Sequence, residues 1–133
     1  MIWIAVDAMG GDEAPRNVVD GALAAVRHFD DLGVLLVGRG EAIEVEVEQY
    51  SQFASIDHRR LRVIHAPDVV SMDESPSAAL RRKPGASIRV AADAVASGEA
   101  SALFSAGHTG AIVMAAHAAF GMLPGVDRPR WPR

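Results

Sequence analysis

Short apolar runs alternate with helical stripes along the sequence, and this alternation restricts the fold more than any other feature. The runs are rich in β-branched residues and are bounded by turn residues, which is typical of buried strands. They cover residues 2–6, 34–37, 61–65 and 102–104. Apolar residues at helical spacing cover 18–29, 41–53, 86–96 and 109–122. The alternation predicts an α/β fold with a mostly parallel sheet in an α/β/α sandwich.

Two segments admit more than one assignment. In residues 41–53, the spacing of Ile43 and Val47 suits a helix, whereas valines that alternate with glutamates suit a strand. The length of the segment favours the helix, and glutamate is favourable in a first turn. Residues 69–84 are expected to form a loop, with at most a short helix that opens at Pro76.

The composition excludes several kinds of site. The sequence has no cysteine, so disulfides, thiolate nucleophiles and cysteine-based zinc sites are excluded. Thirteen basic and seventeen acidic side chains give a net charge of −4, which argues against a nucleic-acid partner. The histidines lack metal-ligand spacing, so no metal is expected. No apolar run reaches the roughly 20 residues that span a bilayer, and we expect a cytoplasmic chain.

Two clusters of basic residues are expected to be solvated. The first consists of Arg59, Arg60 and Arg62. The second covers residues 81–83, and it has an alternative role in meeting an acidic partner or a phosphate.

The loop after the first strand combines glycines with carboxylates. Right-handed crossovers place the loops that follow parallel strands along one edge of the sheet, where ligands bind in open α/β folds. Gly10 and Gly11 permit close approach of a ligand, and the amides that open the next helix suit a phosphate. Asp7 and Asp12 would repel that anion. The alternative is a simple turn in which Asp12 caps the helix and Pro15 lies in its first turn.

The loop after the last strand, residues 105–110, consists of small and polar residues. Ser105 and Thr109 can donate hydroxyl hydrogen bonds, and the amides from Gly107 onward can form a nest for phosphate or a developing oxyanion. His108 can donate a hydrogen bond or shuttle a proton. The alternative is a turn that only requires small residues.

The sequence carries Asp-x-Met-Gly-Gly-Asp at residues 7–12 and Ser-Ala-Gly-x-Thr-Gly-Ala at residues 105–111. Together these motifs resemble those of the bacterial acyl-[acyl-carrier-protein]–phosphate acyltransferases of fatty acid and phospholipid synthesis. The likeness continues in the same order at residues 35–38, 73–74, 81–83 and 125–129. It covers nearly the whole chain, and the two motifs are highly specific when they occur together.

The resemblance implies an enzyme that moves a fatty acyl group from an acyl-carrier-protein thioester to inorganic phosphate, without a cofactor. It also implies the α/β/α fold of the phosphotransacetylase and isocitrate-dehydrogenase type, a homodimer and peripheral association with the membrane. The partners would be acyl-carrier protein and inorganic phosphate. The residues carried over for substrate and phosphate binding are Asp7, Gly10, Gly11, Ser105, Gly107, Thr109 and Gly110. The candidate catalytic residues are Asp12 and His108.

Three features depart from the pattern of the family. Glu13 stands where histidine is expected, and His108 stands where asparagine is expected. Residues 130–133 read as the product of a single-base deletion in GC-rich DNA. We therefore expect residues 1–129 to be the N-terminal part of a truncated acyltransferase domain, followed by an out-of-frame tail, and the chain alone to be inactive. The alternative is a small α/β domain that binds a phosphate or nucleotide without catalysis.

Overall fold

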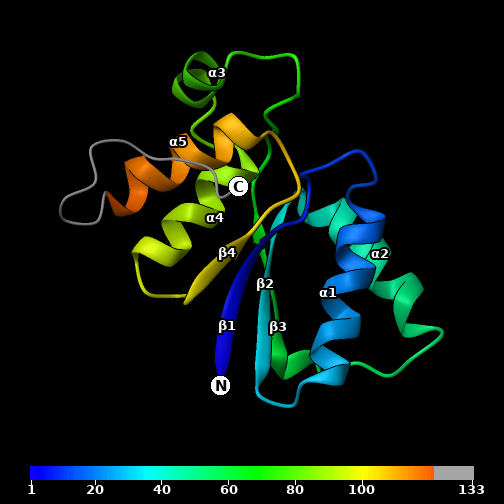
Figure 1. Ribbon diagram of the computed structural model, residues 1–133. Helices are drawn as coiled ribbons and strands as arrows, with labels where there is room; N and C mark the ends of the chain where they lie inside the picture. Colours follow the sequence, from blue (N-terminus) through cyan, green and yellow to red (C-terminus); the bar gives the residue numbers. More distant parts are fainter. Residues whose placement is uncertain (122–133) are drawn as a thin grey trace.

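The structure, a computed structural model, describes residues 1–121. Its centre is a four-stranded sheet in the order β3-β2-β1-β4, and every pair of neighbours is parallel (Figure 1). The strands are β1 (Ile2–Asp7), β2 (Leu32–Gly38), β3 (Leu61–His65) and β4 (Ala102–Phe104). The predicted α/β fold with a parallel sheet is confirmed.

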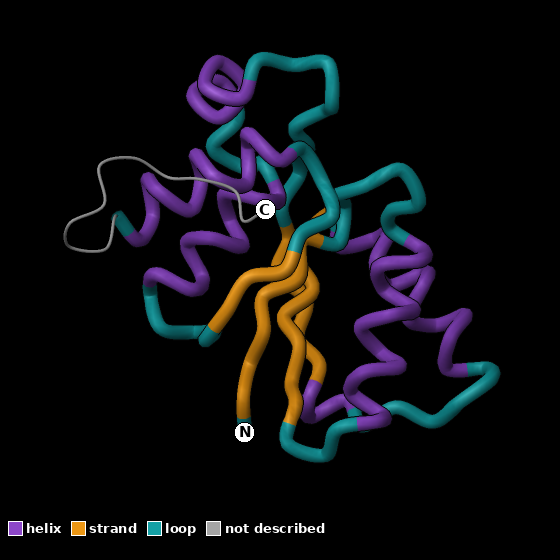
Figure 2. The backbone as a smooth tube through the Cα atoms, viewed as in Figure 1, coloured by secondary structure: helices purple, strands orange, loops and turns teal. Residues whose placement is uncertain are grey.

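Helices cover both faces of this sheet. They are α1 (Arg16–His28), α2 (Gly40–Ser51), α3 (Pro76–Arg82), α4 (Ser87–Ala96) and α5 (Thr109–Phe120), with a short 3-10 helix, η1 (His58–Arg60). Figure 2 shows α1 and α2 on one side of the strands and α4 and α5 on the other. The segment predicted at 41–53 is therefore a helix rather than a strand, although it ends at Ser51, and Pro76 does open a short helix.

Helix α1 packs on one face of the sheet through its apolar side. Val19, Leu23 and Val26 follow helical spacing, are fully buried, and pack with Val34 and Leu36 of β2. β2 is apolar on both faces because it lies inside a parallel sheet that has helices above and below it.

The second layer is built from small side chains. Ala91 and Ala94 of α4 pack against Ala5 and Leu35 of the sheet, and all four are buried. Short side chains let the helix approach the sheet closely, so a core with few aromatic residues still excludes water.

Arg60 clamps the end of α1 to the sheet. Its Nη1 donates to the carbonyl oxygens of Val26 (2.8 Å), Phe29 (2.8 Å) and Leu32 (3.1 Å). The side chain is 13% exposed and also pairs with Asp57. The expectation that Arg60 is solvated is wrong, because the carbonyl groups at the end of a helix need donors and this guanidinium supplies them.

The prediction that Asp12 caps the first helix is also wrong. Residues 11–14 form a turn, closed by the hydrogen bond from Ala14 N–H to the Gly11 carbonyl. The helix consequently begins only at Arg16, and the exposed Asp12 side chain makes no cap. Met122, where the last helix was expected to end, and the proposed tail at 130–133 lie outside the described residues.

Candidate functional site

The two loops with glycine motifs meet at the carboxyl edge of the sheet. They follow β1 and β4, which are parallel neighbours, so both loops leave the sheet on the same side. The Oγ of Ser105 donates a 2.8 Å hydrogen bond to Oδ2 of Asp7, although the two residues are 98 positions apart. The predicted meeting of the loops along one edge is confirmed.

Asp7 and Ser105 hold each other in place. Asp7 is 3% exposed, and its other oxygen accepts a hydrogen bond from the backbone N–H of Met9 at 3.3 Å. The Ser105 oxygen in turn accepts from the backbone N–H of Gly107 at 3.1 Å. The hydroxyl group thus donates and accepts within the protein, so it positions the loop in this arrangement.

Glycines are required where the loops touch. A Cβ on Gly10 would lie 2.7 Å from Oδ2 of Asp7, 2.9 Å from Oγ of Ser105 and 3.0 Å from the nitrogen of Gly107. Gly11 has a φ of +100°, a conformation that L side chains rarely adopt. We call this junction, formed by Asp7, Gly10, Gly11, Ser105 and Gly107, the loop junction.

His108 caps α5 with its own side chain. Nδ1 accepts from the backbone N–H of Ala111 at 3.4 Å, and Nε2 lies 3.2 Å from the carbonyl oxygen of Glu74. Because Nδ1 accepts, these partners assign the ring proton to Nε2, which donates to that carbonyl. Both ring nitrogens are therefore engaged, and a proton shuttle would require the ring to leave Glu74.

The start of α5 carries backbone N–H groups that make no hydrogen bond within the described residues. Within residues 1–121, no hydrogen bond engages the backbone N–H of Thr109 or Gly110, and the Thr109 side chain is exposed. Gly110 packs against Pro76, since a Cβ there would lie 2.9 Å from Cγ of that proline. A helix N-terminus with free amides and a hydroxyl group is suited to an anion.

An ion pair between Lys83 and Glu74 stabilises this region, and the sequence did not predict it. Lys83 Nζ donates to Oε1 of Glu74 at 2.6 Å and to the carbonyl of Val69 at 2.9 Å. The Lys83 ammonium, together with the backbone N–H of Ser71, lowers the pKa of Glu74 to about 2. Lys83 is thus not the solvated helix end that was expected, and it fixes the segment whose carbonyl receives His108. The signal in the sequence was the acidic pair 73–74 ahead of the basic run.

Behind the loop junction lies a cavity of only about 10 Å³. Ser87, the 2% exposed first residue of α4, lines it together with Asp7 and His108. Such a volume accommodates about one water molecule. A phosphate ion is larger than a water molecule, so the cavity has no room for one.

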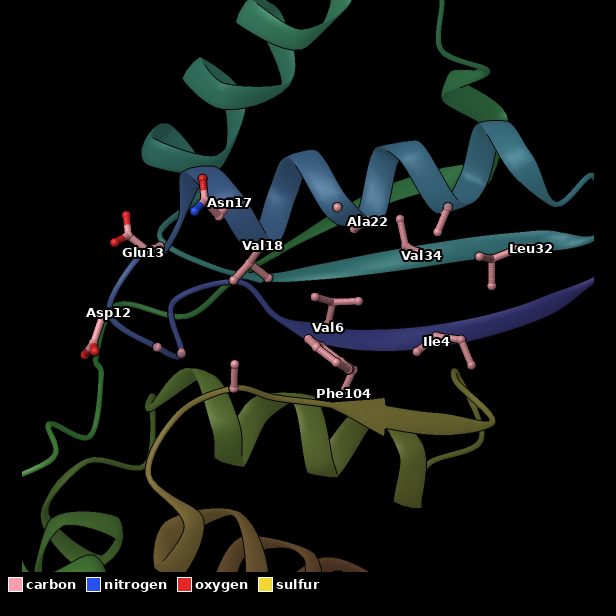
Figure 3. Close-up of a pocket in the computed structure, with 15 residues that line it drawn as sticks. Ile4, Val6, Asp12, Glu13, Asn17, Val18, Ala22, Leu32, Val34 and Phe104 are labelled. Atoms are coloured by element: carbon pink, nitrogen blue, oxygen red, sulfur yellow. The ribbon is translucent and has the colours of Figure 1, made fainter.

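A larger apolar groove lies on the opposite side of the Gly10–Gly11 turn. Its volume is about 600 Å³, and it runs between α1, β1 and β4 (Figure 3). Asp12 and Glu13 lie at one end of the row of apolar side chains that line it. Among the described residues, no hydrogen bond links Asp12 to the loop junction or to His108, so the structure does not join the two candidate catalytic residues.

Residues 2–131 match the family described as "Fatty acid synthesis protein". The chain belongs to this family. Relatives that resemble it include the phosphate acyltransferase of Pseudomonas syringae pv. syringae (strain B728a), 49% identical over 126 residues, which are 95% of this chain and 36% of that protein. Another is the phosphate acyltransferase of Thermosynechococcus vestitus, 48% identical over 126 residues, which are 95% of this chain and 35% of that protein. The chain therefore spans about a third of the length of these relatives.

Two features are absent from the part of the chain that the structure describes. Among residues 1–121, no helix has the length and apolar character needed to cross a membrane. The same residues contain no group of three or more histidine, aspartate or glutamate side chains placed to hold a metal ion.

Proposed function

We propose that this chain supplies the phosphate-binding loops of an acyltransferase that transfers a fatty acyl group from acyl-carrier protein to inorganic phosphate. The observation that carries the proposal is the loop junction, which holds two glycine loops against each other beside the free amides of α5. The relatives named phosphate acyltransferase support the reaction class. The carrier protein as donor follows from the resemblance of the motifs.

The proposed reaction needs positioning more than it needs a protein nucleophile. A phosphate oxygen attacks the thioester carbonyl carbon, the new C–O bond forms, and the C–S bond breaks. The phosphate hydroxyl proton passes to the departing sulfur, so hydrogen phosphate and thioester give acyl phosphate and thiol. Amides and hydroxyls that hold the phosphate and the developing oxyanion lower the barrier.

The residues divide into two roles in this proposal. Thr109 and Gly110 bind phosphate through the hydroxyl group and the free backbone amides. Asp7, Ser105 and Gly107 position the loop that presents these groups, as do the close contacts of Gly10 and Gly11. For His108, holding the first turn of α5 is the role that fits its hydrogen bonds. Asp12 would orient polar groups at the groove end.

The complete enzyme would be a cytoplasmic homodimer with peripheral membrane association. Since the chain spans about a third of its relatives' length, we expect activity to require segments found in the other two thirds. The chain by itself would then bind phosphate without catalysing the transfer.

A chimera tests this proposal. The chain replaces the 126 matched residues of the Pseudomonas syringae relative, and acyl phosphate is trapped with hydroxylamine after addition of acyl-carrier-protein thioester and phosphate. We expect phosphate-dependent product. Thr109→Val should raise the KM for phosphate about tenfold, the effect of losing one hydrogen bond to a charged group, and Thr109→Ser should restore it. Phosphate binding without any product would favour the noncatalytic phosphate-binding domain, and full phosphate affinity in Thr109→Val would contradict the assigned role.

A further inference from the structure

The two faces of the sheet are covered unequally at β4. Leu103 points into the layer of α4 and α5, where it packs with the buried clusters. Ala102 and Phe104 point to the other face, and Phe104 is 53% exposed. Among residues 1–121, no helix lies over β4 on that face (Figures 1 and 3). Parallel sheets are normally buried on both faces, so we expect another element to cover the part of this face that α1 and α2 leave open.

The shape of the apolar groove suits a packed helix. Ile4 and Val6 of β1 make its floor, and Phe104 forms one side. The opposite side is the surface of α1, where Gly21 and Ala22 present almost no side chain. A Cβ on Gly21 would meet nothing within 4 Å. Small residues at such a surface allow a second helix to approach closely, at roughly the 8–10 Å between axes that is usual for packed helices.

The relatives contain additional residues that could pack in this groove. The matched residues make up 36% of the Pseudomonas syringae phosphate acyltransferase, so about two thirds of that protein has no counterpart in this chain. We infer that an amphipathic helix from that unmatched part packs into the groove between α1 and β4 and completes the α1 layer. The carboxylates of Asp12 and Glu13 at the groove end favour a lysine or arginine at the nearby end of the helix.

The test compares the isolated chain with the chimera described above, by urea unfolding of each. Two substitutions place a charge in the groove from different elements, Phe104→Glu on β4 and Gly21→Glu on α1. In the isolated chain both side chains would project into solvent, so we expect each to change the unfolding equilibrium constant by no more than about fivefold, which includes the gain in helix propensity at Gly21. In the chimera each charge would be buried beneath the helix, and we expect a change of more than about thirtyfold.

Phe53→Glu is the matched control. Phe53 is 88% exposed and does not line the groove, so this variant should behave alike in the two proteins. Hydrogen exchange adds a second readout that does not depend on a substitution, because an added helix should slow exchange of groove-facing amides in residues 18–25 of the chimera. Both readouts report on packing, so they stand apart from the acyl-transfer assay.

Three results would overturn the inference. Equal effects of the groove variants in the chain and the chimera would mean that nothing covers the groove. An effect of Phe104→Glu without one of Gly21→Glu would mean that an added strand beside β4, rather than a helix, covers Phe104. Palmitate that slows exchange of residues 18–25 in the isolated chain to the rate in the chimera would make the groove a lipid site.

Discussion

Replacing Ser105 by alanine removes the hydroxyl group that joins the two glycine loops. Among residues 1–121, the substitution leaves the Asp7 carboxylate with a single hydrogen bond, from the backbone N–H of Met9 at 3.3 Å. It also takes away the acceptor of the Gly107 amide. Asp7 is 3% exposed, so water has little access to replace the lost donor.

The expected cost follows from these contacts. A hydrogen bond to a charged group contributes about 1.5–3 kcal/mol to the free energy of unfolding, more than a neutral one. The Gly107 amide is only partly buried and regains some of its loss from water. Together the two losses give a decrease of about 2–3 kcal/mol for Ser105→Ala.

Urea unfolding of the isolated chain, followed by circular dichroism, measures this decrease. With a slope of about 2 kcal/mol/M, the midpoint should fall by about 1–1.5 M. Ser101→Ala is the matched control, because Ser101 is exposed, stands just before β4, and uses only its backbone N–H, which donates to Trp3. It should cost less than about 0.5 kcal/mol.

A double-mutant cycle with Asp7→Asn separates the bond from general damage to the loop. The two substitutions should be non-additive by about 1 kcal/mol or more, since each disrupts the same hydrogen bond. Strict additivity, or a Ser105→Ala cost no larger than that of Ser101→Ala, would refute the role of this bond in holding the loop junction.

Three further predictions concern stability. Arg60→Met should lower the free energy of unfolding by about 2 kcal/mol because three carbonyl groups lose a donor, whereas Arg59→Met, at a side chain that is 90% exposed, should change it by less than about 0.5 kcal/mol in the same urea assay. The pKa of Glu74 is lowered from 4.5 to about 2, so its contribution to stability is present above pH 4.5 and is lost as the pH falls toward 2; thermal unfolding across this range should show the loss, and Lys83→Met should diminish it. Gly21→Ala should stabilise the isolated chain by about 0.5–1 kcal/mol, because Gly21 lies within α1 and a Cβ there meets nothing within 4 Å; a lower urea midpoint would contradict the helix-propensity argument.

The strands and helices could be predicted from the sequence because their signals are local. Val19, Leu23 and Val26 carry helical spacing whatever they pack against, and the buried run of β2 is apolar in either orientation. The predicted helix at 41–53 was right because length outweighed a short alternation of valine and glutamate.

Two errors have a common physical origin. Asp12 is of a residue type that caps helices, but the turn at 11–14 delays the helix and leaves the carboxylate outside it. Arg60 lies in a basic cluster, yet its acceptors come from the distant end of α1 and the turn to β2. In both cases the partner is set by tertiary geometry, which residue type and local spacing do not contain.

The site could be predicted only to the level of the loops. Their meeting follows from the general rule for parallel sheets. The individual partners do not follow from it, because the bond from Ser105 to Asp7 requires β4 to lie directly beside β1. The roles of Glu74 and Ser87 depend on how the segment between β3 and α4 folds back over the loops.

The strand order also decides when this chain can complete its site during synthesis. β1, β2 and β3 pair in the order in which they leave the ribosome, so that part of the sheet can form early. The other edge of β1 stays unpaired until β4 has been synthesised. The Asp7 carboxylate gains its hydrogen bond from Ser105 only after 98 further residues. The loop junction can thus form only after most of the described structure has been synthesised, and a nascent chain that stops before β4 has a nearly complete α1 and α2 layer but no loop junction.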